Sequence, residues 1–355
     1  MWKPVVLKLS WNRDCKSVEW FFNAVIVCHP ICRRIREGLA VMILLGMVLP
    51  GWGAEWKLQR EFRAEHMVIE TVHNAQRVFA GTRVSGIDVF SVSSEKLLSR
   101  IRLPQYSGVF SKLRASLFSL DLSGDGRFLA VASNHGKVLF YNPETLELAR
   151  TLEFPGIDSL TAIRFVDDES FIAGTLGGEV LLAEIDGKVR YRHPVEYDAV
   201  NRLALSPDRS RFAVATNASV IRVFETSGGD LLRELKGHKD AVYDLIFVEE
   251  HTLLSCGKDR RLLAWDLESG AVRELYYSDS YIHALAFSSV QGTIVFPADN
   301  HQLALMSWPR GEVFQTLSGH KAFVHSLRFS TAGTELWSGG NDSMVRLWSN
   351  ESNLN

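Results

Sequence analysis

Short apolar segments separated by polar turns follow one another from residue 55 onward. Large apolar side chains alternate within each segment, and the turns are rich in Asp, Gly and Ser, which is the pattern of β-strands joined by tight turns. One large apolar residue recurs at intervals of 43, 40, 42, 40 and 42 residues, and these anchors are Leu122, Phe165, Leu205, Phe247, Phe287 and Phe329. A weaker copy anchored at Val72 lies upstream, so the pattern predicts seven repeats.

The repeat length and the type of strand together predict the architecture. Repeats of about 40–45 residues with several strands each are typical of β-propeller blades. The segments are too short, and too rich in β-branched and aromatic residues, for a helical repeat. We therefore expect an all-β fold, a seven-bladed β-propeller over residues 55–355. The step from Val72 to Leu122 is longer than the others because it contains an insertion, Pro104–Ala115.

The two ends of the repeat array predict how the ring closes. The last repeat runs through Met344–Trp348 and leaves no room for a fourth strand of its own before Asn355. Trp56–Phe62 precedes the first repeat just as Leu231–Leu235 precedes the fifth. We expect Trp56–Phe62 to supply the outer strand of the seventh blade, because this pairing removes two exposed sheet edges.

Two repeats carry a recognisable family pattern. Gly237–Asp266 contains a Gly-His pair, three short apolar strands and a terminal Trp-Asp, and Gly319–Trp348 follows the same order. Both segments resemble WD repeats, the blades of WD40-type propellers. This resemblance implies a ring whose faces and rim bind other proteins, and it implies no catalysis.

The same resemblance assigns a hydrogen-bonded tetrad to each of these two blades. The tetrad residues are His238, Ser255, Asp259 and Trp265 in the fifth blade, and His320, Ser338, Asp342 and Trp348 in the seventh. Ser, His and Asp also form hydrolase triads, but no G-x-S-x-G nucleophile turn surrounds either serine. We therefore expect the tetrads to be structural.

The other blades depart from the Trp-Asp ending. The pairs that we expect in its place are Phe90-Ser91, Tyr141-Asn142, Phe224-Glu225, Trp308-Pro309 and, in the seventh blade, Trp348-Ser349. The resemblance therefore covers about 300 residues but is specific only in the fifth and seventh blades.

The first 54 residues differ in character from the repeats. Arg33, Arg34 and Arg36 precede the apolar segment Leu39–Leu49, which is too short to span a bilayer and is followed by small residues. This order is typical of a secretory signal peptide, cleaved after Gly53 or Ala54. Because residues 1–32 are an unusual preface, we expect translation to begin near Arg33. An uncleaved anchor that includes Trp20–Ile31 is the alternative.

Charge and cysteine content limit the functional classes. The whole chain has a formal net charge of −2, and residues 55–355 carry 32 basic and 38 acidic residues. No basic field favours nucleic acid. Cys256 is the single cysteine after residue 54, so no intrachain disulfide is expected there, and its apolar setting predicts a buried thiol.

The histidines suggest an alternative to a purely protein-binding role, namely a ligand or metal site in the central channel. His283 and His325 occupy equivalent places in first strands, where Asn201 and Tyr243 are their counterparts, so their side chains could line the central channel and bind a ligand or metal. No His or Cys spacing typical of a zinc or copper site occurs. Quinoprotein, sialidase and haem-attachment motifs are also missing from residues 55–355. We expect no catalytic residue, no cofactor and no metal.

The candidate partner surface combines the insertion with one basic turn, on a single face. Aromatic and basic side chains on a long exposed loop suit a protein contact; these residues are Tyr106, Phe110, Lys112 and Arg114 in the insertion and Lys258, Arg260 and Arg261 in the turn. The alternatives are a loop packed over its own blade and a solvated turn.

We therefore predict an exported, periplasmic and monomeric interaction scaffold with a protein partner in the same compartment, touching a membrane only through an uncleaved signal segment. The signal, the degenerate blades and the insertion also resemble the WD-repeat accessory proteins of bacterial periplasmic nitrate respiration. That resemblance implies help in maturing or supplying electrons to the reductase. The competing class is a ligand-binding or enzymatic propeller that uses the central channel.

Overall fold

The computed structural model describes residues 6–7, 24–25, 55–84, 86–107, 112–195 and 198–350. The chain divides into two units, Met1–Trp52 and Gly53–Asn355. In the first unit, β1 (Val6–Leu7) pairs antiparallel with β2 (Ala24–Val25). The predicted signal segment and its cleavage point lie outside the described residues. Among the described residues, no helix has the length and apolar character needed to cross a membrane.

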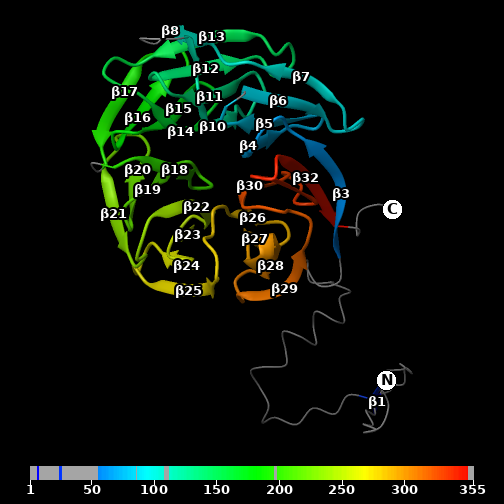
Figure 1. Ribbon diagram of the computed structural model, residues 1–355. Coiled ribbons are helices and arrows are strands. Elements are labelled where there is room, and N and C mark those ends of the chain that lie inside the picture. The colour runs from blue at the N-terminus through cyan, green and yellow to red at the C-terminus, as the bar shows by residue number, and fades with distance from the viewer. Residues whose placement is uncertain are drawn as a thin grey trace, which may run out of the picture. The chain divides into compact units, whose positions relative to one another are not determined.

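The second unit contains seven four-stranded antiparallel sheets, numbered here as blades one to seven, around a central axis (Figure 1). Blade one comprises β4 (Val68–His73), β5 (Arg77–Thr82), β6 (Gly86–Ser91) and β7 (Leu97–Ile101). Blade two comprises β10 (Leu117–Leu122), β11 (Leu129–Ser133), β12 (Lys137–Tyr141) and β13 (Leu148–Glu153). Blade three comprises β14 (Leu160–Phe165), β15 (Ser170–Thr175), β16 (Glu179–Glu184) and β17 (Val189–Pro194).

The remaining blades follow in chain order. Blade four comprises β18 (Val200–Leu205), β19 (Arg211–Thr216), β20 (Val220–Glu225) and β21 (Leu231–Lys236). Blade five comprises β22 (Val242–Glu249), β23 (Thr252–Gly257), β24 (Arg261–Asp266) and β25 (Val272–Tyr277). Blade six comprises β26 (Ala286–Ser288), β27 (Thr293–Pro297), β28 (Leu303–Ser307) and β29 (Glu312–Leu317), with the short 3-10 helix η1 (Asp299–His301) between β27 and β28. Blade seven comprises β30 (Val324–Phe329), β31 (Glu335–Gly340), β32 (Met344–Asn350) and the early strand β3 (Trp56–Arg63).

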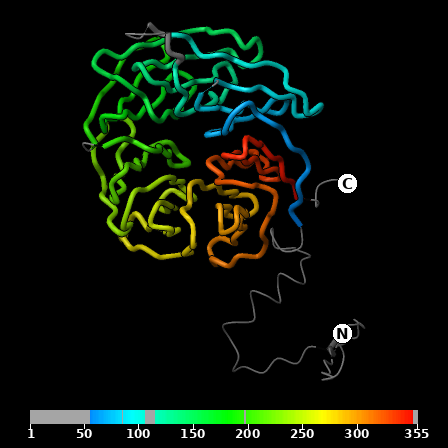
Figure 2. Tube along the Cα trace, in the orientation of Figure 1, coloured from blue at the N-terminus to red at the C-terminus, as the bar shows by residue number. Residues whose placement is uncertain are grey.

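The predicted closure of the ring is confirmed. β3 pairs antiparallel with β32, from Trp56 opposite Asn350 to Arg63 opposite Met344, so strands from the two ends of the repeat array lie side by side (Figure 2). The first strand of each blade contacts the first strand of the next, and β30 contacts β4. The side chains of Trp56 and Phe62 are buried in this seam. The seven-bladed fold therefore has no gap between blades seven and one.

Blade packing explains why apolar residues recur where they do. The middle strands are buried on both faces because each blade is covered by its two neighbours, as in β12, where Val138, Leu139 and Phe140 are all buried. Close approach also requires small residues. A Cβ added to Gly174 in blade three would lie 2.3 Å from Val200 Cγ1 of blade four, so a larger side chain would push the two blades apart.

One anchor prediction is wrong by one residue. His73, not Val72, pairs with Val78 in the register of the other anchors. A polar residue fills this place because the His73 ring stacks on buried Trp337, with ring centroids 5.4 Å apart. Because the anchors were identified as large apolar residues, the sequence prediction selected the neighbouring Val72.

The Trp-Asp equivalent in blade six is also corrected. Met306 pairs with Ile294 in the register in which Trp265 pairs with Leu253. Met306-Ser307 therefore occupies the Trp-Asp place, and Trp308-Pro309 lies in the turn that follows β28. The sequence prediction chose Trp308 because a tryptophan ends the family pattern, but Trp308 lies two residues beyond that place.

The antiparallel order of strands defines two faces. Turns between the second and third strands lie on the same face as the connections from each fourth strand to the next blade, and we name this the upper face. The lower face carries the turns between the first and second strands and between the third and fourth. The β8 (Gln105–Ser107) and β9 (Lys112–Arg114) hairpin lies within the connection from blade one to blade two and so belongs to the upper face.

Candidate functional site

The tetrad of blade five is a continuous chain of hydrogen bonds. Trp265 Nε1–H donates to Ser255 Oγ over 2.7 Å, and His238 lies 2.7 Å from Ser255 Oγ through Nε2. His238 Nδ1 lies 2.8 Å from Asp259 Oδ2, which also accepts the backbone N–H of Lys239. Burial opposes ionisation of Asp259, but its bonds to His238 and to the Lys239 N–H lower its pKa overall. Because Ser255 is fully buried, no substrate reaches its hydroxyl.

Blade seven has the same series of hydrogen bonds, and the cation Arg346 extends it. Trp348 Nε1–H donates to Ser338 Oγ over 2.9 Å, and His320 Nε2 lies 2.8 Å from the same oxygen. Asp342 contacts His320 Nδ1 at 3.1 Å and accepts a 2.8 Å bond from the guanidinium of Arg346. The second guanidinium contact, 2.7 Å to Glu61, ties β32 to β3. The tetrad geometry thus supports the seam that closes the ring, and sequence reasoning missed Arg346.

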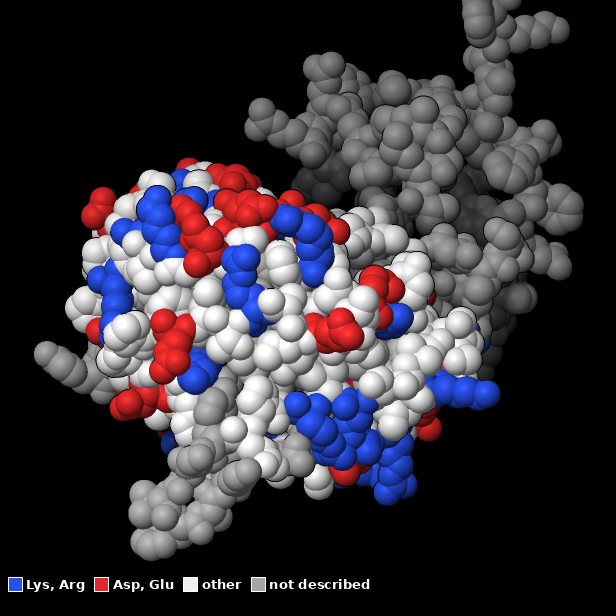
Figure 3. Space-filling model, turned by 90° about the horizontal axis from the view of Figure 1, so that it is seen from above, with Lys and Arg blue, Asp and Glu red and all other residues white. Residues whose placement is uncertain are grey.

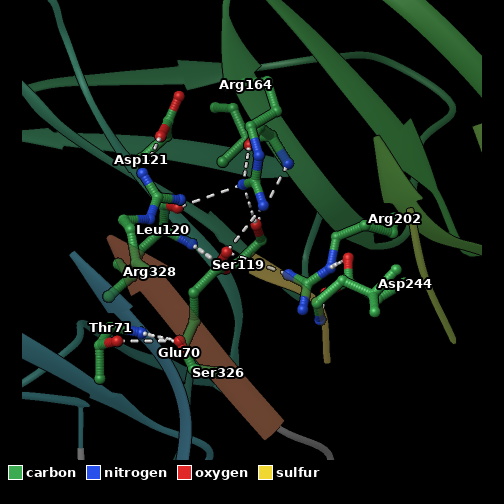
Figure 4. A network of polar contacts seen from close by, with 12 residues as sticks. Glu70, Thr71, Ser119, Leu120, Asp121, Arg164, Arg202, Asp244, Ser326 and Arg328 are labelled. Carbon is green, nitrogen blue, oxygen red and sulfur yellow. Dashed lines mark hydrogen bonds and ion pairs between the residues drawn. The ribbon is translucent and has the colours of Figure 1, made fainter. Parts of the chain in front are cut away.

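A second polar system, missed by the sequence reasoning, joins neighbouring blades beside the channel (Figure 4). At four junctions the third residue of a first strand accepts a hydrogen bond from a backbone N–H of the next blade. The donor lies in that blade's first strand, or, for Leu285, directly before it. The pairs are Glu70 with Leu120 at 2.8 Å, Ser119 with Ile163 at 3.4 Å, Asp244 with Leu285 at 2.8 Å, and Ser326 with Thr71 at 2.9 Å. These buried bonds fix the rotation of each blade against its neighbour. Equivalent polar positions in successive repeats are the signal that could have found them.

Glu70 is the centre of this system. Its Oε1 accepts bonds from Arg164 of blade three at 2.8 Å and from Arg202 of blade four at 3.0 Å, across the channel from blade one (Figure 4). Burial opposes its ionisation, but the guanidinium groups of Arg164, Arg202 and Arg328 outweigh that penalty and lower its pKa to about 2. The ionised carboxylate of Glu70 therefore links blade one to blades three and four through ion pairs.

The ion pairs continue around the channel. Arg202 Nε lies 3.0 Å from Asp244 Oδ1, and Arg328 of blade seven lies 3.4 Å from Asp121 of blade two. Burial raises the pKa of Asp244 although Arg202 opposes the change. These groups line a cavity of about 660 Å³ that opens on the lower face. Within this lining, Glu70, Asp121 and Asp244 are each paired with an arginine.

The upper mouth of the same channel is aromatic. Tyr243 stacks on His283 with ring centroids 4.8 Å apart and an interplanar angle of 12°, and His325 lies 4.9 Å from His283. Phe323 and Tyr281 meet the edges of this stack, with centroids 5.2 and 6.2 Å from that of His283. The structure thus brings together the two histidines that the sequence placed at equivalent positions.

Burial makes these histidines poor bases. Burial and the nearby His325 lower the pKa of His283 to about 4, and burial also lowers the pKa of His325. Both rings are therefore neutral at pH 7. In the described part of the chain, no three His, Cys, Asp or Glu side chains converge to hold a metal ion.

Blade six is irregular where it meets this mouth. Its first strand is reduced to three residues, and Pro297 at the end of β27 removes a donor from the ladder. Asn300 and His301 follow with φ of 57° and 61°, a conformation that costs non-glycine residues energy. The His301 ring lies edge-on to Phe323, 5.6 Å away. Backbone conformations that cost energy are found preferentially at functional sites.

The predicted partner residues divide into two sets. Lys258, Arg260 and Arg261 lie at the upper end of blade five, where they line a hollow of about 530 Å³ with Lys239 and Tyr277. Residues 105–107 and 112–114 form the β8–β9 hairpin, but Phe110 and the side chains of Tyr106, Lys112 and Arg114 lie outside the described parts of the structure. On the side that Figure 3 shows, basic and acidic side chains are interspersed over the upper part, whereas basic side chains gather near the lower edge.

The comparisons with known proteins agree with this geometry. The family model "WD domain, G-beta repeat" matches residues 229–266 and 311–349, which contain the two tetrads. The chain is similar to the nuclear distribution protein PAC1 of Arthroderma benhamiae, with 32% identity over 173 residues, 44% of this chain and 37% of the relative.

Two other relatives show the same partial coverage. Identity to the periodic tryptophan protein 2 of Arabidopsis thaliana is 29% over 156 residues, 43% of this chain and 17% of that protein. Identity to the ribosome biogenesis protein WDR12 homolog of Anopheles gambiae is 29% over 119 residues, 32% of this chain and 28% of that protein. The chain thus matches well under half the length of these relatives. The seven sheets make this chain a seven-bladed β-propeller, and the two blades that carry the tetrads match the WD40 repeat.

Proposed function

We propose that this protein is a non-catalytic scaffold that binds a protein partner through the upper mouth of its channel. The observation that carries the proposal is the exposed aromatic cluster of Tyr281 and Phe323 around the His283 stack. These two residues are 43% and 40% exposed although their side chains are large and aromatic. Aromatic residues that are rigidly held on a surface are the usual anchors of protein interfaces.

The rest of the molecule supports this choice of face. The buried tetrads and the Glu70 network fix the blades, so the upper mouth is a preformed surface that loses little conformational freedom on binding. In the lower half of the channel, Glu70, Asp121 and Asp244 are already paired with arginines. The backbone irregularity at Asn300 and His301 lies beside the aromatic cluster, where selection for binding would offset its cost.

Two further proposals concern where the protein acts and which process it serves. We propose export to the periplasm from the signal-like Arg33–Leu49 segment, and N-terminal sequencing of the mature protein tests it directly. An accessory role in periplasmic nitrate respiration rests on the layout of the sequence, whereas the relatives named above are nuclear distribution and ribosome biogenesis proteins of eukaryotes. Loss of nitrate-dependent respiration after deletion of the gene would support that role, and unchanged respiration would remove it.

The scaffold proposal is tested by quantitative partner capture from native cells. Tagged wild-type protein and the double variant Tyr281→Ala/Phe323→Ala are compared, with partners identified by mass spectrometry. Phe314→Ala is the matched control, because Phe314 lies on the outer strand of blade six and is 41% exposed. We expect the double variant to lose a partner that both the wild type and Phe314→Ala retain. Equal recovery with all three proteins would contradict the proposed surface.

A further inference from the structure

The hollow at the upper end of blade five carries a second, charged contact. We propose that it binds the carboxylates of an acidic peptide segment in the partner protein. This inference rests on the proposed scaffold function and specifies the chemistry of its partner. The hollow is lined by Lys239, Lys258, Arg260, Arg261 and Tyr277, together with Asp240, Asp259 and Glu274.

Contacts with Tyr277 fix the guanidinium of Arg260 in an orientation that suits a carboxylate. Its guanidinium carbon lies 4.9 Å from the centroid of the Tyr277 ring, and the guanidinium also hydrogen-bonds to the Tyr277 hydroxyl. Stacking on an aromatic ring fixes the plane of the guanidinium and leaves N–H donors at its edge for a planar anion. The backbone of Arg260 has φ of 67°, in the tight turn between β23 and β24.

The cations of the hollow divide into paired and unpaired groups. Lys258 Nζ lies 3.2 Å from Asp240, and Arg261 Nε lies 2.6 Å from Glu274. Lys239 and Arg260 make no ion pair with any other residue that the structure describes. Lys239 is nevertheless fixed at its backbone, because its N–H donates to Asp259 Oδ2 over 2.9 Å. Two positive charges are therefore offered to a ligand, Arg260 from the turn between β23 and β24 and Lys239 from the connection between β21 and β22.

The third carboxylate of the lining does not cancel them. Asp259 is engaged by His238 within the tetrad and its side chain is 3% exposed. The lining thus carries one more basic than acidic group on a chain whose overall charge is negative. Charge complementarity of this kind steers and orients an acidic partner.

The position of the hollow favours a peptide over an isolated anion. Tyr277 ends β25, and the chain continues directly into the loop that carries Tyr281 at the aromatic mouth. Tyr281 in turn contacts Tyr243, with ring centroids 6.4 Å apart. A segment that places acidic side chains in the hollow can therefore place an apolar side chain at the mouth.

The test uses purified protein and a fluorescein-labelled hexaglutamate peptide in fluorescence anisotropy. We expect saturable binding that weakens as NaCl rises from about 50 to about 300 mM, because partly exposed charges are screened. The variant Lys239→Ala/Arg260→Ala should weaken binding about tenfold, since two charge-assisted contacts are lost. The matched control is Lys188→Ala/Arg273→Ala, which removes an exposed lysine and an arginine stacked over Trp308, away from the upper face.

Three results would overturn the inference. The first is hexaglutamate binding that the double variant leaves unchanged, and the second is equal binding of a hexalysine peptide. The third is displacement of the peptide by millimolar inorganic phosphate, which would indicate a general anion site. Partner capture separates this inference from the scaffold proposal. Loss with Tyr281→Ala/Phe323→Ala but full retention with Lys239→Ala/Arg260→Ala would leave the scaffold proposal intact and remove the hollow from it.

Discussion

Replacing Glu70 by Gln should destabilise the propeller strongly, because Gln keeps the shape of the side chain and removes its charge. The pKa of Glu70 is lowered from 4.5 to about 2 in the folded protein. One pKa unit corresponds to about 1.4 kcal/mol, so the charged form contributes about 3 kcal/mol to the free energy of unfolding at neutral pH. In the variant, Arg202 keeps its ion pair with Asp244, but Arg164 faces a neutral amide, and a buried charge that has lost its partner is costly.

The sign of the pH dependence follows from the same shift. Because the folded pKa lies below the unfolded one, the stabilisation is complete above pH 4.5 and is lost as the pH falls toward 2. The assay is thermal melting by circular dichroism from pH 7 to pH 3. At pH 7 we expect Glu70→Gln to melt roughly 5–10 °C below the wild type. The difference should shrink with acidification.

The control is a surface carboxylate of the same type. Glu153 is 68% exposed and lies 3.2 Å from Lys137, and Glu153→Gln should change the melting temperature little because exposed ion pairs contribute at most about 1 kcal/mol. Glu70→Gln protein that melts like the wild type at pH 7 would refute the reasoning. So would a gap in melting temperature that stays constant down to pH 3.

Three further predictions address other parts of the fold. Asp259→Asn should lower the free energy of unfolding by about 1–3 kcal/mol because it breaks a buried hydrogen-bonded chain, and an unchanged melting temperature would count against the tetrad. Deletion of residues 55–62 should open the ring and lower the melting temperature, and a truncated protein that melts like the intact one would contradict the closure by β3. Burial raises the pKa of the Cys256 thiol, so it should react with a disulfide reagent only after denaturation, and fast labelling of the native protein would contradict its burial.

The fold could be predicted from the sequence because each blade repeats one pattern of burial. Middle strands covered on both sides must be apolar, and turns must recur at the blade length. Even the exchange of β3 into blade seven followed from counting strands. The two errors in alignment arose where a blade breaks the pattern. The partly buried ring of His73 stacks on Trp337, and Met306 takes the place of the tryptophan that ends the family pattern.

The site was predicted less completely, for physical reasons. The Glu70 network joins residues from blades one, three, four and five, and no local spacing rule relates Glu70 to Arg202. The pairing of His283 with His325 was accessible because both occupy the same place in successive blades. The exposure of Tyr281 and Phe323 was not accessible, because both residues lie in connections between blades, which no strand pattern describes.

The most direct test of the central claim is the dissociation constant of the captured partner for three purified proteins, measured by calorimetry. We predict that Tyr281→Ala/Phe323→Ala binds at least about tenfold more weakly than the wild type, while Phe314→Ala binds equally well, because buried aromatic anchors dominate interface energies. All three proteins should melt at similar temperatures. Equal affinity of all three for the partner would show that the upper mouth is not the binding surface.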